Sequence, residues 1–83
     1  MRKEAILITG AAGEIGHALI ESLAGHADPP LLTLDLQPLP EDVEELTTHI
    51  QGSILDQALL ERLISEYEFV TIYHLAALFS ACG

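Results

Sequence analysis

Apolar and polar residues alternate along this chain with two different periods. Short apolar runs, typical of strands buried inside a parallel sheet, are separated by stretches in which apolar residues recur every three or four positions, as on one helix face. The predicted strands span residues 5–9, 31–36, 48–51 and 69–75, the third of which is the most polar. The predicted helices lie around residues 15–23 and 58–64. The pattern therefore predicts an α/β fold.

Residues near the ends of these elements support the assignment. Gly25 follows the first helix as a stop signal, and Asp56 can cap the start of the second helix. The acidic stretch 41–45 is expected to form either a helical turn or a solvated loop. We expect one face of the first helix to lie on the sheet, formed by Ile15, Ala18, Leu19, Ser22 and Leu23.

The order of the elements predicts the topology of the sheet. A strand, a helix and two strands are followed by a second helix and a fourth strand. With right-handed crossovers, this order gives a parallel sheet with strand order 3-2-1-4 and flanking helices. No repeat, low-complexity tract or linker divides residues 1–83, so we expect one domain.

The charge balance restricts the possible partners. The chain has 13 acidic residues against 3 Lys and Arg, which gives a net charge of −10. We therefore exclude nucleic acid and anionic membranes as partners. Any bound phosphate must be held mainly by backbone N–H groups and a helix dipole.

The remaining features of the composition favour a folded protein of the cytoplasm. Hydrophobic residues make up 49 % of the chain, too many for a disordered segment. Cys82 is the single cysteine, and the apolar run near the N-terminus is far too short for a signal peptide or a membrane span. His74 has no second His or Cys at metal-ligand spacing, so we predict no metal site.

Between the first strand and the first helix stands the sequence TGAAGEIG, residues 9–16. Its three glycines are expected to have separate tasks. Gly10 makes the tight turn, Gly13 lets the backbone approach a pyrophosphate, and Gly16 lets the helix pack closely on the sheet. A purely structural strand-to-helix turn is the alternative interpretation.

Asp35 ends the second strand 19 residues after Gly16, near the spacing at which an acid accepts hydrogen bonds from the ribose of a dinucleotide. A carboxylate there favours NAD over NADP because it would repel a 2′-phosphate, and residues 36–38 offer no cation. Asp35 is also an ordinary residue for a turn at a strand end. No P-loop lysine follows the glycines, which excludes a kinase or ATPase of that type.

Two motifs together resemble the extended short-chain dehydrogenases, the NAD-dependent epimerase/dehydratase family. They are the glycine motif and the segment YHLAA, residues 73–77, at the end of the fourth strand. The resemblance covers essentially the whole chain and implies the first part of an NAD-binding Rossmann domain. The cofactor-binding positions that it implies are Gly10, Ala12, Gly13, Glu14, Ile15, Gly16, Asp35, Ser53, Ile54, Leu75, Ala76 and Ala77.

One of these positions departs from the family, and one further segment has a narrower likeness. Ser53-Ile54 stands where the family often has Asp-Leu or Asp-Ile beside adenine. Residues 71–83 are also similar to short-chain-type L-threonine 3-dehydrogenases, in which the serine matched by Ser80 lies by the substrate.

The family's catalytic Tyr-x-x-x-Lys motif is not found here, because neither Tyr67 nor Tyr73 is followed by lysine four residues later. The resemblance therefore implies an inactive N-terminal fragment of an enzyme that transfers hydride between NAD and a carbinol, such as a nucleotide sugar or a small hydroxy or amino acid like L-threonine. The intact protein is expected to form a homodimer. Two alternatives are a non-catalytic dinucleotide-sensing or interaction module, and a folding remnant whose fourth strand has an open outer edge.

Overall fold

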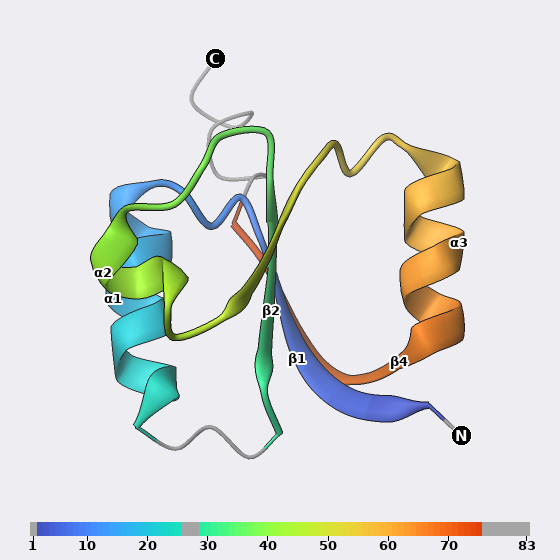
Figure 1. Ribbon diagram of the computed structural model, residues 1–83, viewed down its shortest axis with the longest axis horizontal. Helices are drawn as coiled ribbons and strands as arrows, with labels where there is room; N and C mark the ends of the chain where they lie inside the picture. The colour runs from blue at the N-terminus through green and yellow to red at the C-terminus, as the bar shows by residue number, and fades with distance from the viewer. Residues whose placement is uncertain (1, 26–28, 76–83) are drawn as a thin grey trace.

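A parallel sheet of four strands, with helices on both faces, forms the described part of the chain (Figure 1). The computed structural model describes residues 2–25 and 29–75. The strand order is β3-β2-β1-β4, as predicted. The elements in chain order are β1 (Lys3–Thr9), α1 (Glu14–Ala24), β2 (Leu31–Asp35), α2 (Glu41–Glu44), β3 (Thr48–Gln51), α3 (Gln57–Glu66) and β4 (Tyr67–His74).

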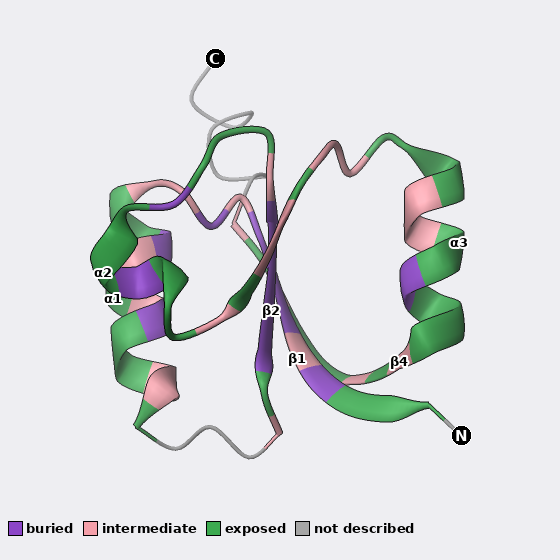
Figure 2. Cartoon of the chain, in the orientation of Figure 1, coloured by how far each residue is buried: buried purple, intermediate pink, exposed green. Residues whose placement is uncertain are grey.

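Helices α1 and α2 cover one face of the sheet, and α3 covers the other (Figures 1 and 2). The two central strands, β1 and β2, are therefore covered on both faces and carry most of the core. Alternate residues of a strand point to opposite faces. On the α1 side, Ile8 and Leu31 pack with Ile20 and Val43. On the α3 side, the buried residues are Leu7, Leu32, Leu34 and Leu63. Residues 5–9 and 31–34 are therefore nearly continuously buried, as their apolar runs predicted.

The rotation of α1 differs from the predicted one. Its buried residues are Gly16 and Ile20, whereas Ile15 is 56 % exposed. Ala18 and Ser22 of the predicted face are also exposed, while Leu19 and Leu23 are partly buried. The cause is steric. A Cβ on Gly16 would lie 2.2 Å from the Ala11 carbonyl oxygen, so the helix turns its side-chain-free position toward that loop.

Two local predictions are confirmed and one open alternative is decided. Gly25 is the C-cap of α1, although its φ of −68° is right-handed. The Asp56 carboxylate caps α3 by accepting the Leu59 N–H at 3.1 Å. The acidic stretch forms the short helix α2, which buries Val43.

Strand β4 lies at one edge of the described sheet, and its middle is exposed. The register against β1 shifts between Ala5 and Ile6, so that Val70 is an extra residue. As a result, Phe69 packs on the α3 side while Tyr73 packs on the α1 side. Val70 is 48 % exposed and Ile72 is 58 % exposed.

The contact at Gly16 predicts a large effect of a small substitution. We expect Gly16→Ala to lower the free energy of unfolding by about 1 to 3 kcal/mol, because its methyl group meets backbone atoms that cannot rotate away. Denaturant unfolding with matched m-values would measure the change.

Gly25→Ala is the matched control at the other end of α1. Apart from its chain neighbours, no heavy atom of the described residues lies within 4 Å of the position of its Cβ, and the backbone there is right-handed. We expect it to be neutral or to stabilise by about 0.4 to 1 kcal/mol. Equal losses in both variants would contradict the assigned role of Gly16.

Candidate functional site

The glycine loop, residues 10–13 between β1 and α1, turns the chain sharply where β1 ends. Gly10 has a φ of 70°, and it is the one residue with a positive φ in the ranges 2–25 and 29–75. This left-handed conformation favours glycine. The Gly10 N–H donates to the carbonyl of Leu34 at 2.9 Å, which holds the turn against the end of β2.

The loop leads directly into the N-terminus of α1. Gly13 is the N-cap, and no side chain makes a capping hydrogen bond there. The first N–H groups of a helix have no partner within the helix, and the first helical bond here runs from the His17 N–H to the Gly13 carbonyl at 2.9 Å. The amides of Glu14 and Ile15 therefore lie at the positive end of the helix dipole, where an anion is stabilised.

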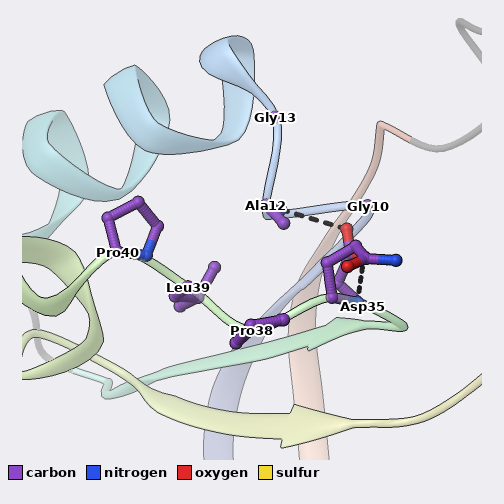
Figure 3. A pocket seen from close by; sticks show the side chains of 8 residues that line it. Gly10, Ala12, Gly13, Asp35, Pro38, Leu39 and Pro40 are labelled. Atoms are coloured by element: carbon purple, nitrogen blue, oxygen red, sulfur yellow. Dashed lines mark hydrogen bonds between the residues drawn. The ribbon is translucent and has the colours of Figure 1, made fainter.

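The Asp35 carboxylate ties the end of β2 to this loop. One oxygen, Oδ2, accepts the Ala12 N–H at 3.0 Å, and the other, Oδ1, accepts the Gln37 N–H at 2.8 Å (Figure 3). An ionised carboxylate has about four acceptor sites. Two backbone donors thus fix its orientation and leave capacity for two more, such as the neighbouring hydroxyls of a ribose.

Two cavities meet at Gly10 and Asp35. The larger, about 770 Å³, lies between the glycine loop and the segment after β2, and it is lined by Gly10, Ala12, Gly13, Asp35, Gln37, Pro38, Leu39 and Pro40. The smaller, about 290 Å³, is lined by Gly10, Leu34, Asp35, Leu36, Gly52, Ser53, Ile54 and Leu55. Their volumes are in the range of small-molecule and cofactor sites.

The structure brings most of the predicted site residues together. The glycine loop, Asp35 and the pair Ser53-Ile54 surround the two cavities. The Ser53 hydroxyl accepts the Leu55 N–H at 3.0 Å and so shapes its own turn. Leu75 follows β4 and donates its N–H to the Thr9 carbonyl at 2.9 Å, beside the start of the loop. The predicted residues Ala76, Ala77 and Ser80 lie outside the described residues.

Sequence reasoning missed the segment that closes the larger cavity. Residues 37–40 line it, although the sequence pattern predicts no binding role for them. His49 was also missed, although its ring lies 3.0 Å from the Gln37 carbonyl oxygen. A Pro-rich segment directly after the predicted ribose-binding acid was the available signal. His74, considered as a ligand, instead pairs with the Thr9 hydroxyl.

A second polar cluster ties α1 to α2. His17 Nε2 lies 2.8 Å from Asp42 Oδ2, and His17 Nδ1 lies 3.2 Å from Glu21 Oε1. These three groups are close enough to be considered for a metal ion. However, the two carboxylates pair with different ring nitrogens, which point away from each other. We interpret the cluster as two surface contacts of His17, which become ion pairs when the imidazole is protonated.

The sheet order 3-2-1-4 and the glycine loop between β1 and α1 define a Rossmann-type domain. The model of the NAD dependent epimerase/dehydratase family matches residues 6–83. The chain therefore belongs to this family, as the two sequence motifs implied.

Individual relatives are consistent with this family. The chain is 34 % identical over 82 residues to a UDP-glucose 4-epimerase of Pasteurella multocida, covering 89 % of this chain and 24 % of the relative. It is 33 % identical over 82 residues to a dTDP-4-dehydro-6-deoxyglucose reductase of Escherichia coli, covering 90 % and 26 %. The chain thus spans about a quarter of the length of these relatives.

No solved structure matches the chain significantly. In residues 2–25 and 29–75, none of the helices has the length and apolar character needed to cross a membrane.

The His17 cluster predicts a pH-dependent contribution to stability. The hydrogen bond to Asp42, and then the charges of Asp42 and Glu21, raise the pKa of His17 above its ordinary value of 6.5, although desolvation opposes them. Because the pKa is higher in the folded state, this stabilisation is complete below pH 6.5 and is lost as the pH rises through the raised pKa.

The free energy of unfolding should therefore be higher for the parent protein than for the His17→Gln variant at pH 6. This difference in free energy should shrink toward pH 9. We expect a small effect that salt screens, since the pairs lie at the surface. Urea midpoints of both proteins across this range would measure it, and Asp42→Asn should remove most of the dependence. A difference that stays constant with pH would refute the assignment.

Proposed function

We propose that this segment holds the adenosine and pyrophosphate portion of NAD. The observation that supports this most strongly is the Asp35 carboxylate, fixed by two backbone N–H groups between a glycine loop and two cavities. The family match to residues 6–83 supports a nicotinamide dinucleotide as the cofactor.

In this proposal the pyrophosphate lies against the amides that begin α1. The turn at Gly10 and the absence of a side chain at Gly13 let the backbone come close to it. The chain's three cations, Arg2, Lys3 and Arg62, belong to the start of β1 and to α3, away from the glycine loop. Backbone amides and the helix dipole must therefore stabilise the phosphate charge.

The ribose of adenosine would donate its two hydroxyls to the free acceptor sites of Asp35. The adenine ring would then enter the smaller cavity, where Leu34, Leu36 and Ile54 offer apolar contacts. A 2′-phosphate would meet the Asp35 carboxylate without a compensating cation, so NAD is preferred over NADP.

For the intact protein we propose an oxidoreductase activity on a carbinol. Bound NAD supplies hydride exchange at its nicotinamide ring. Nucleotide sugars are one substrate class, supported by the relatives' names, UDP-glucose 4-epimerase and dTDP-4-dehydro-6-deoxyglucose reductase. Small hydroxy or amino acids such as L-threonine are the other. Ala76 and Ala77 would contact the cofactor and Ser80 the substrate.

We also propose that the catalytic tyrosine and lysine of the intact protein are not among these 83 residues, so that these residues alone are inactive. The intact enzyme is proposed to be a cytoplasmic homodimer without nucleic-acid or membrane partners.

Calorimetric titration of the intact protein with NAD and with NADP tests the cofactor proposal. We expect NAD to bind more tightly than NADP. Asp35→Ala should weaken NAD binding by at least about tenfold, because charge-assisted hydrogen bonds to the ribose are lost.

Two further variants make the test specific. Asp35→Asn keeps the shape but removes the charge, so it should narrow the preference for NAD over NADP. Glu61→Gln, an exposed acid on α3, should change neither affinity. If NAD bound equally well to the parent protein and to Asp35→Ala, the proposed ribose site would be wrong.

A further inference from the structure

His49 connects β3 to the segment that borders the proposed ribose site. It pairs in register with Thr33, and both residues point to the α1 side of the sheet. The His49 Nε2 atom lies 3.0 Å from the carbonyl oxygen of Gln37, and the Nδ1 atom lies 2.9 Å from the Thr33 hydroxyl. Both ring nitrogens therefore have a partner.

These partners determine the tautomer of the ring. A carbonyl oxygen can only accept a hydrogen bond, so Nε2 must carry the proton. In the neutral ring, Nδ1 is then an acceptor, and the Thr33 hydroxyl donates to it. Thr33 is completely buried, and its alternative acceptor, the Thr48 carbonyl, is farther away at 3.5 Å. The ring is thereby fixed from the interior of the sheet.

The same peptide segment is bonded to the carboxylate of the proposed site. Gln37 accepts from His49 through its carbonyl and donates its N–H to Asp35 Oδ1 at 2.8 Å. The other carboxylate oxygen accepts the Ala12 N–H at 3.0 Å. A continuous chain of hydrogen bonds thus runs from Thr33 through His49, Gln37 and Asp35 to the glycine loop.

Packing contributes little to the position of this segment near Asp35. Leu36, Gln37 and Pro38 are exposed, and the side chain that enters the core is that of Leu39. The His49 hydrogen bond therefore holds the part of the segment next to the carboxylate.

We propose that His49 is a positioning residue that sets the selectivity for NAD over NADP. This inference rests on the proposed function, in which Asp35 binds the ribose. To admit a 2′-phosphate, the carboxylate must turn away or residues 36–38 must move. Either movement strains the chain of hydrogen bonds that His49 holds to the sheet. Without His49, residues 36–38 move more easily. The affinity for NAD therefore falls, while the affinity for NADP falls less or rises.

Two conservative variants of the intact protein separate this role from general stability. A glutamine amide can replace the Nε2 donor, whereas the shorter asparagine amide corresponds to Nδ1 and does not reach the Gln37 carbonyl. We expect His49→Asn to raise the Kd for NAD by about 3- to 10-fold, the effect of one lost hydrogen bond. The ratio of the NADP and NAD dissociation constants should fall by a similar factor, and His49→Gln should restore both values toward those of the parent.

The results distinguish a wrong role for His49 from a wrong ribose site. If His49→Asn leaves both dissociation constants unchanged, or raises both equally, while Asp35→Asn alters the preference for NAD, the role of His49 is wrong and the ribose site stands. If the parent protein does not bind NAD, or Asp35→Asn has no effect, the proposed function and this inference fall together.

A measurement on the parent protein covers the case in which His49→Asn does not fold. Long-range ¹H–¹⁵N spectra of the imidazole rings distinguish the two neutral tautomers. We expect the Nε2–H form at His49, whereas an Nδ1–H form would overturn the proposal.

Discussion

The close contact between Gly16 and the Ala11 carbonyl is the constraint on which the site depends. A Cβ at Gly16 would lie 2.2 Å from that oxygen, so only glycine allows the helix to approach the loop this closely. This approach sets the rotation of α1 and places Ile20 in the core. It also places the start of the helix two residues after Ala12, whose N–H donates to Asp35. The contact thus determines both the buried face of α1 and the location of its free N–H groups.

Charge explains why the proposed phosphate site is built from backbone groups. With a net charge of −10 and three cationic side chains, the chain has little with which to attract a phosphate. The glycine loop and the α1 N-terminus supply positive potential without any cationic side chain. In the proposed site, the one acid at the centre, Asp35, would recognise hydroxyl groups, and its two backbone donors keep it in place. The same carboxylate that would bind the ribose of NAD would repel the extra phosphate of NADP.

The topology could be predicted, and several residues that line the two cavities could be named in advance, because both depend on local patterns. The apolar runs at 5–9 and 31–36 and the glycines between them are enough to indicate a strand, a turn and a helix. The face of α1 could not be predicted from apolar spacing, because Gly16 is buried for its lack of a side chain. The extra residue Val70 in β4 depends on pairing with distant β1. The hydrogen bond from His49 to Gln37 joins β3 to the segment that follows β2, 12 residues earlier in the chain, and leaves no periodic signal.

A crystal structure of the intact protein with NAD would test the central claim most directly. We predict that the pyrophosphate lies against the backbone between Gly10 and Gly16, and that both hydroxyls of the adenosine ribose lie within hydrogen-bond distance of the Asp35 carboxylate. A structure with the pyrophosphate away from the glycine loop, or with the ribose turned away from Asp35, would contradict the account.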